Sequence, residues 1–242
     1  MFDTIILLTG QVEEPTLTAV LRGHNPRLNI RAVQSATELA AIDQGILARA
    51  RLVAFATAVV VPAKILKALG FGAYNFHPGP PTYPGWVPSH FAIYDKAGHF
   101  GVTAHIMVEQ VDAGPIVGCK LFGIPDGATV TRLQAMAFME LARLFWHLAL
   151  RLATVPEPLP ELPIQWSGSK STRRMHAAKC DIPVEISKEE LDRRIAAFGD
   201  SLFDIWPTVT LHGYRFKYCA PQAEPALEAP TVMPAPKIAA SA

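Results

Sequence analysis

Four short apolar runs alternate with helical segments along the first 77 residues, and this alternation restricts the fold more than any other feature. The runs cover residues 4–8, 28–33, 51–56 and 72–77, and the predicted helices between them cover residues 14–22, 36–49 and 63–69. The first run, Thr-Ile-Ile-Leu-Leu, is typical of a parallel strand that is covered on both faces. Because alternating strands and helices form βαβ units, the sequence predicts an α/β fold with a mostly parallel sheet.

The middle of the chain predicts two further strands and a long helix. Residues 101–111 and 116–124 are rich in β-branched and apolar side chains, so we expect a hairpin-like pair around the turn that begins at Asp112. Residues 88–94 predict a short helix. Residues 129–153 predict a long amphipathic helix, because apolar side chains recur there at helical spacing. This pattern predicts that Met136 and Met139 lie in the core.

The C-terminal third predicts a small appendage. Four prolines among residues 156–163 indicate a rigid linker. Residues 187–198 predict a helix that begins with a capping box of Ser187 and Glu190, and residues 207–218 predict a hairpin that turns at His212-Gly213. We therefore expect a catalytic domain over residues 1–155, a linker with a small helix-hairpin extension over 156–219, and a disordered Ala/Pro-rich tail over 220–242.

The fourth apolar run ends in two polar side chains that would share one side of a strand. Asn75 and His77 are two residues apart and would point the same way, whereas Phe76 would point into the body of the protein. The following Pro-Gly-Pro-Pro lacks backbone donors that a central strand needs, so the strand ends at His77. Because ligands of open α/β sheets bind outside the carboxyl ends of the strands, we expect a site here.

Asp112 closes the predicted strand at residues 101–111 and is the candidate partner of His77. A carboxylate there would orient the imidazole and favour its protonated form, raising the pKa of His77 toward neutrality. Asn75 would donate a hydrogen bond to an oxyanion without adding charge. The three residues predict acyl transfer, and the absence of a Ser or Cys nucleophile favours direct transfer to an amine. An Asn-x-His pair by itself is also common by chance.

A metal site is the competing interpretation of the same region. Four histidines lie between residues 77 and 105, but their spacings of 13, 9 and 6 match no compact zinc motif. We therefore expect no metal. His105 is expected close to the site, whereas His90 and His99 are expected at the surface or in loops.

Four short motifs follow one another in order between residues 75 and 116. They are Asn-x-His-Pro at 75–78, Tyr-x-Gly at 83–85, Gly-Val-Thr-x-His at 101–105 and Val-Asp-x-Gly-Pro-Ile at 111–116. This order resembles the formyltetrahydrofolate-dependent formyltransferases, which include glycinamide ribonucleotide, methionyl-tRNA and nucleotide-sugar formyltransferases. The resemblance is strongest over residues 51–125 and continues more weakly to about residue 218. It implies a Rossmann-like catalytic domain and 10-formyltetrahydrofolate as the formyl donor.

The resemblance also implies roles for individual residues. It implies that Asn75, His77 and Asp112 are catalytic. It implies contact with the donor's pterin ring by Ala56, Thr57, Val59, Val61, His105, Val111, Ala113 and Gly114. It implies that four residues lie near the acceptor: Pro78, Gly79, Tyr83 and Gly85. Many members carry Ser-Leu-Leu-Pro where residues 79–82 are Gly-Pro-Pro-Thr, and this departure concerns the choice of acceptor.

The acceptor is expected to be a nucleotide-linked amino sugar. Thr9-Gly10 has a single glycine where glycinamide ribonucleotide formyltransferases carry a glycine-rich turn. The residues after 218 are too few for the barrel of the tRNA enzymes, and a net charge of +1 provides no basic field for nucleic acid. Glycinamide ribonucleotide and methionyl-tRNA nevertheless stay open as alternative acceptors, and hydrolysis of the donor to formate stays open as an alternative reaction. Outside enzymes, the alternative is a folate- or nucleotide-binding module on the same fold.

Three further features bear on the location and partners of the protein. Its three cysteines are widely spaced without a CxxC pair, which is typical of free thiols in a reducing compartment. The N-terminus lacks a basic region before its apolar run, and charges interrupt residues 135–153, so we expect a cytoplasmic protein without a membrane span. The basic run at 170–174 is a candidate pyrophosphate contact or a solvated face. Sugar formyltransferases commonly pair through a short C-terminal piece, which implies a homodimer.

Overall fold

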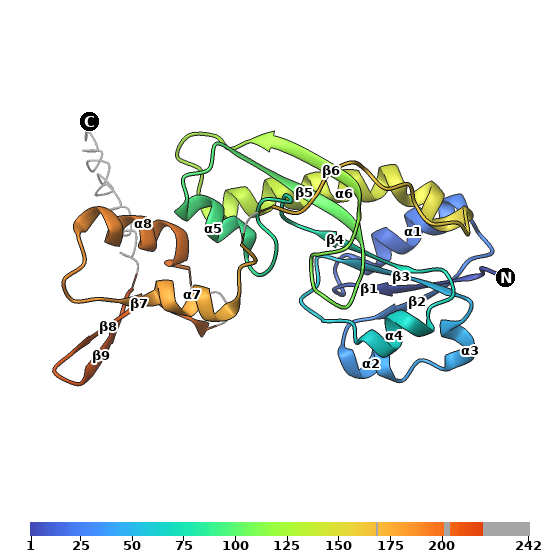
Figure 1. The fold of residues 1–242 in the computed structure, drawn as a ribbon, viewed down its shortest axis with the longest axis horizontal. Helices are drawn as coiled ribbons and strands as arrows, with labels where there is room; N and C mark the ends of the chain where they lie inside the picture. Colours follow the sequence, from blue (N-terminus) through green and yellow to red (C-terminus); the bar gives the residue numbers. More distant parts are fainter. Residues whose placement is uncertain (168, 201–203, 220–242) are drawn as a thin grey trace, which may run out of the picture.

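A six-stranded sheet forms the centre of the molecule (Figure 1). The computed structural model describes residues 1–167, 169–200 and 204–219. The strand order is β2-β1-β3-β4-β5-β6. The strands are β1 (Thr4–Leu8), β2 (Asn29–Val33), β3 (Ala50–Phe55), β4 (Ala73–His77), β5 (His99–Ile106) and β6 (Ile116–Gly123). The first four are parallel, and β5 and β6 continue the sheet in antiparallel pairs. The predicted α/β fold with a mostly parallel sheet is confirmed.

Helices cover both faces of the sheet. One layer consists of α1 (Glu14–His24) and α6 (Val130–Thr154), and the other of α2 (Ala36–Ala40), α3 (Gln44–Leu47) and α4 (Ala63–Ala68) (Figure 1). Alternate side chains of β1 point to opposite faces, so Ile5 and Leu7 belong to the core under α1 and α6, whereas Ile6 and Leu8 belong to the other core. All four are fully buried, which explains why this run is continuously apolar.

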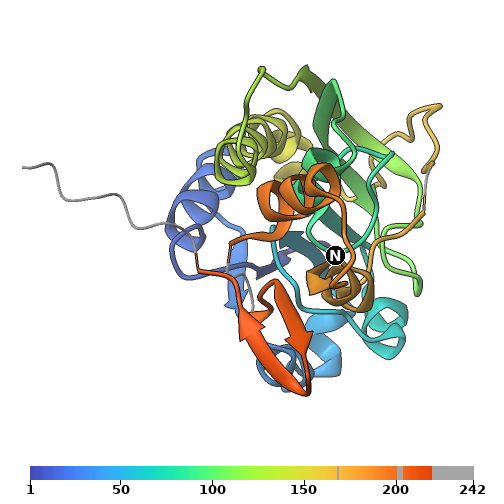
Figure 2. The ribbon, with the colours of Figure 1, turned by 90° about the vertical axis from the view of Figure 1, so that its left-hand side faces the viewer.

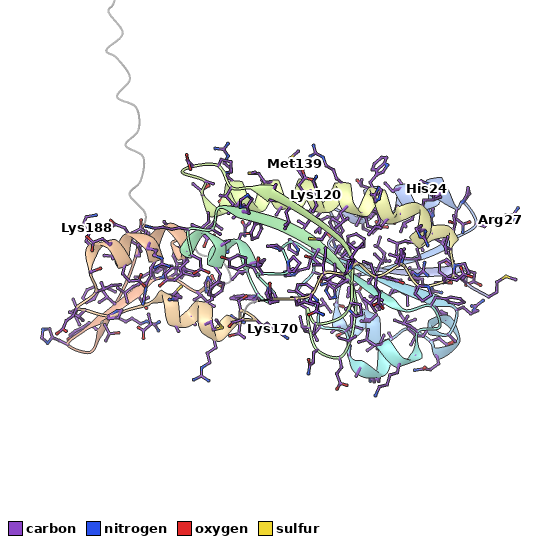
Figure 3. The ribbon with its side chains drawn as sticks, turned by 45° about the horizontal axis from the view of Figure 1, so that its top comes forward. His24, Arg27, Lys120, Met139, Lys170 and Lys188 are labelled. Carbon is purple, nitrogen blue, oxygen red and sulfur yellow. The ribbon has the colours of Figure 1, made fainter. Side chains whose placement is uncertain are left out.

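Two helix predictions are wrong in detail. Residues 36–49 form two short helices instead of one, because the Asp43 carboxylate accepts a hydrogen bond from Gly45 N (2.7 Å) and starts α3 after α2 has ended. Met139 is 56% exposed and lies on the outer side of α6 (Figure 3). The buried stripe of α6 includes Ala137, and a residue two positions further along lies on the opposite side of a helix.

The strand predicted over residues 101–111 also ends earlier than expected, at Ile106. Ile106 N donates to the carbonyl of Pro115, so the chain between them closes a loop at residues 107–115. Asp112 stands in this loop, with a left-handed backbone (φ 47°) that aspartate adopts more readily than most residues. The carboxylate therefore reaches the sheet from a loop and not from the end of a strand.

The C-terminal extension contains a second sheet of three strands (Figure 2). β8 (Thr208–Leu211) and β9 (Tyr214–Lys217) form the predicted hairpin, with positive φ at His212 and Gly213 in its turn. Helix α8 (Lys188–Phe198) begins as predicted, because the Ser187 hydroxyl accepts a hydrogen bond from Glu190 N. The sequence did not predict α7 (Arg173–Cys180) or β7 (Asp181–Ile182). The tail expected at residues 220–242 lies outside the described residues.

Helix α5 (Pro88–Tyr94) connects the sheet with this extension. Its Phe91 packs against Phe198 of α8, with 5.5 Å between the ring centroids. His90, also in α5, is fully buried under α8 and lies 3.1 Å from the carboxylate of Asp200. The expected surface position of His90 is therefore wrong, because α8 covers it. His99, at the start of β5, is exposed as expected.

Two general features complete the description. Cys119, Cys180 and Cys219 are all free thiols, as expected. Among the described residues, no helix is both long enough and apolar enough to cross a bilayer.

Candidate active site

Strand β4 ends with two polar side chains on one side and a buried aromatic ring on the other. Phe76 is fully buried, and its ring centroid lies 5.2 Å from that of Phe145 in α6. Asn75 and His77 point the other way, and both line a cavity of about 290 Å³. The chain leaves the sheet directly after His77. The cavity therefore lies at the carboxyl end of β4, where the alternation and the prolines predicted a site.

Asp112 binds the polar groups of this cavity from the loop at residues 107–115. One carboxylate oxygen, Oδ2, lies 3.5 Å from His77 Nδ1 and accepts a hydrogen bond from Gly85 N at 2.8 Å. The other, Oδ1, lies 3.2 Å from His105 Nε2 and 3.5 Å from Asn75 Nδ2. The two histidines and the carboxamide thus all lie within 3.5 Å of the same carboxylate.

Asn75 makes one firm contact and one weak contact. Its Nδ2 lies 3.1 Å from His105 Nε2. His105 Nδ1 in turn faces the carbonyl of Ile106 at 2.9 Å, and the same Nε2 also faces Asp112 Oδ1 at 3.2 Å. The second N–H of Asn75 has only the 3.5 Å contact with Asp112. That N–H is therefore available to a ligand oxygen in the cavity.

The charge on Asp112 is stabilised by its neighbours. Burial raises the pKa of this carboxyl group, but the hydrogen bond with His105, the electrostatic interaction with His77 and the Gly85 N–H together lower it more. The resulting pKa is about 2, so Asp112 is ionised throughout the neutral range.

His77 behaves differently from the prediction. Its Nε2 lies 3.1 Å from the carbonyl of Tyr83 and its Nδ1 faces Asp112, so only the imidazolium can donate to both acceptors. Burial nevertheless outweighs both acceptors and lowers the pKa of His77. The expected rise toward neutrality is therefore wrong, because the ring is only 5% exposed and the charged form loses its hydration. A neutral imidazole beside a fixed carboxylate can accept a proton.

The cavity contains only some of the residues expected to touch ligands. It is lined by Thr57, Val59, Val61, Gly85, His105 and Val111. Six others lie outside its lining: Ala56, Pro78, Gly79, Tyr83, Ala113 and Gly114. Three of these six support the site through their backbones or their small size. The carbonyl of Tyr83 contacts His77, the carbonyl of Gly114 contacts Trp166, and a Cβ at Gly79 would lie 2.5 Å from His77 Nε2.

The sequence predictions missed Ser171 and Trp166. Ser171 lines the cavity together with Lys170 of the predicted basic run, and Trp166 packs against both imidazoles. Lys170 lines the cavity, and Figure 3 shows it between the sheet and the C-terminal extension. The basic run at 170–174 was a usable signal for Lys170, but no local pattern distinguishes Trp166.

Two other observations concern possible ligands. Within the described ranges, no group of three or more His, Cys, Asp and Glu side chains is arranged to hold a metal ion. A larger cavity, about 720 Å³, lies between α8 and the hairpin of β8 and β9, and it is not lined by Asn75, His77 or Asp112.

Comparison with known proteins identifies a family whose sequence pattern matches this chain. A family model described as formyl transferase matches residues 21–142, just over half of the chain. A methionyl-tRNA formyltransferase of Enterococcus faecalis is 28% identical over 176 residues, which cover 70% of this chain and 54% of that relative. The chain therefore spans about half the length of the curated relative.

Solved structures of low sequence identity share the fold. A sugar N-formyltransferase from Shewanella superposes with a TM-score of 0.74 at 15% identity, covering 89% of this chain and 96% of that one. An N-formyltransferase from Helicobacter canadensis, solved with folinic acid and dTDP-3-aminofucose, superposes with a TM-score of 0.63 at 16% identity, covering 88% and 85%.

Proposed function

The chain belongs to the formyl transferase family, and we propose that it moves a formyl group from 10-formyltetrahydrofolate to a primary amine. The convergence of Asn75, His77 and Asp112 at one cavity carries this proposal. Asn75 and His77 come from β4 and Asp112 comes from the loop at residues 107–115, yet the three side chains meet at the end of β4. An oxyanion donor, a proton acceptor and an orienting carboxylate are the groups that acyl transfer to an amine needs.

The geometry supports a direct transfer. Asn75 donates its weakly held N–H to the formyl oxygen while the incoming amine attacks the formyl carbon. Neutral His77 takes the proton that the amine releases, and Asp112 stabilises the imidazolium formed. His77 then returns this proton to N10 of the folate as the bond between N10 and the formyl carbon breaks. One proton leaves the amine and one arrives at N10, so the enzyme ends the cycle unchanged.

The cavity has a wall suited to the donor. Residues 57–61 line it with mostly apolar side chains, which fit a flat aromatic ring. The Helicobacter enzyme, which shares this fold, was solved with folinic acid, a folate. We therefore place the pterin of the donor against these residues, with the formyl group toward His77.

For the acceptor we favour a nucleotide-linked amino sugar. Structures of sugar N-formyltransferases superpose over most of this chain, and the Helicobacter enzyme was solved with dTDP-3-aminofucose. Lys170 lines the cavity and supplies a cation for a diphosphate. Methionyl-tRNA is the second candidate, because the curated relatives with detectable sequence similarity are methionyl-tRNA formyltransferases. A homodimer and a domain boundary at residue 155 remain predictions of this proposal.

A turnover assay with a panel of acceptors tests the proposal. The protein is mixed with 10-formyltetrahydrofolate and, separately, UDP- and dTDP-amino sugars, methionyl-tRNA, glycinamide ribonucleotide or no amine, and tetrahydrofolate release is followed together with the mass of the product. We expect rapid release only with an amino sugar. Release without an amine would indicate a hydrolase, and no release with any acceptor would contradict the proposal.

Matched histidine variants test the site itself. His77→Ala should lower turnover by about 100- to 10,000-fold, since it removes the group that transfers protons. His99→Ala is the control, because His99 is exposed at the far end of β5 and should leave turnover unchanged. Near-normal turnover of folded His77→Ala would refute the assigned role.

A further inference from the structure

The segment that follows α6 returns to the active site. It leaves the end of α6 at residue 155 and runs back past the sheet toward α7 (Figure 1). We call residues 156–167 the return segment. Leu162 N donates to the carbonyl of Ile116 at the start of β6, and Ser167 N donates to the carbonyl of Pro81 in the loop after His77. The return segment is therefore attached both to the sheet and to the loop that follows β4.

Trp166 of this segment contacts three parts of the active site at once. Its indole Nε1 donates to the carbonyl of Gly114, two residues after Asp112, at 2.8 Å. Its ring centroid lies 5.8 Å from that of His77 and 5.0 Å from that of His105, and both contacts are edge-to-face. A single side chain thus joins both imidazoles with the loop that carries their carboxylate.

The position of Trp166 separates it from the ligand. Both imidazoles line the cavity of about 290 Å³, but Trp166 is absent from that lining. The indole therefore packs against the histidines without facing the cavity. His77 and His105 are 5% and 2% exposed, and the indole is one of the groups that cover them.

We propose that Trp166 is a positioning residue that fixes the orientation of the two site histidines and excludes water from them. This inference rests on the proposed function. An edge-to-face contact restricts rotation of each imidazole, and the hydrogen bond to Gly114 holds the loop of Asp112 at the distance that its carboxylate requires. A shift of about 1 Å in such a group reduces turnover by about 100-fold.

The pKa of His77 provides independent support and a readout. Burial is the largest cause of its lowered pKa, ahead of the opposing effects of Asp112 and Tyr83. The titratable groups that face the ring are Asp112 and His105. Removing the indole would admit water and reduce the penalty on the charged form. The imidazole of His77 should then titrate at a higher pH than in the wild type.

The test compares Trp166→Ala, Trp166→Phe and the control Trp146→Ala, since Trp146 is 65% exposed on α6. Imidazole NMR titrations are recorded without substrate, and kcat and KM are measured from pH 5 to 9. For Trp166→Ala we expect an upward shift of the His77 titration and a fall in kcat of about 10- to 100-fold, with KM changed only slightly. Trp166→Phe keeps a ring but not the N–H, so the wild-type titration should be retained with a smaller loss of kcat.

The outcomes separate this inference from the proposed function. An unchanged His77 titration and unchanged kcat in Trp166→Ala would overturn the positioning role. A fall in melting temperature without any shift in the titration would assign Trp166 a structural role only, and would overturn it as well. If wild-type protein transfers no formyl group, the proposed function fails, while the NMR titration still decides whether Trp166 controls the imidazoles. If Trp166→Ala does not fold, Trp166→Phe decides through its kcat, which must fall.

Discussion

Replacing Arg51 with methionine should be among the most destabilising single changes in the protein. Arg51 lies in β3 and is fully buried. Its guanidinium donates to backbone carbonyls at 2.8–3.3 Å, and these belong to Phe71, Arg151, Leu152, Val155, Pro156 and Glu157. The last four carbonyls of a helix have no partners within the helix. Arg51 therefore supplies the donors for the end of α6 and for the start of the return segment.

The size of the effect follows from these contacts. Methionine retains most of the aliphatic stem but has no donor. The three shortest bonds, to Leu152, Val155 and Pro156, measure 2.8, 2.9 and 3.0 Å. A net value of about 1.5 kcal/mol for each of these three bonds to a charged donor gives about 4.5 kcal/mol. Relief of the guanidinium's desolvation offsets part of this sum, so we expect a loss of about 3 kcal/mol in the free energy of unfolding.

Urea unfolding followed by circular dichroism measures this loss as a change of midpoint at constant slope. Arg49→Met is the matched control, because Arg49 forms an exposed ion pair with Asp3 at 3.1 Å, and such pairs contribute at most about 1 kcal/mol. Equal losses in the two variants would refute the reasoning. So would a change of less than about 1 kcal/mol in Arg51→Met.

Two further predictions concern the site and the junction between α5 and the C-terminal extension. Gly79→Ala should reduce turnover by about 100-fold without unfolding the protein, because the new Cβ would lie 2.5 Å from His77 Nε2. Gly98→Ala is the control and should have normal turnover, because a Cβ added at Gly98 has no neighbouring atom within 4 Å. Equal turnover of the two variants would contradict the prediction. Burial and the neighbouring His90 lower the pKa of His176 from 6.5 to about 4, so the unfolded state binds the proton first and stability should decline as the pH falls from about 6.5 to about 4. His176→Phe should remove that part of the decline in urea titrations at several pH values, and an unchanged slope would show that His176 is not its source.

Local patterns account for the parts of the fold that were predicted correctly. The continuous apolar run of β1, the hydroxyl that caps α8 and the turn at His212-Gly213 each act within a few residues. The position of Asn75 and His77 also follows from local geometry, since strand alternation and the following prolines place both at one strand end.

The errors have a common origin in packing between distant segments. His90 was expected at the surface, but α8 and Asp200 bury it from more than a hundred residues away in the chain. The pKa of His77 was expected to rise because a carboxylate was foreseen, whereas the loss of solvent that lowers it depends on everything packed around the ring.

The sequence alone determined which chemical groups the chain offers, and it placed Asn75 and His77 at a strand end, because hydrophobic periodicity and proline act locally. Only the tertiary structure decided how those groups are held. It brings the loop of Asp112 and the indole of Trp166 against the end of β4, and it determines the solvent exposure of His77. Burial, and with it proton affinity, is a property of the whole packed chain, so no local pattern of residues can specify it.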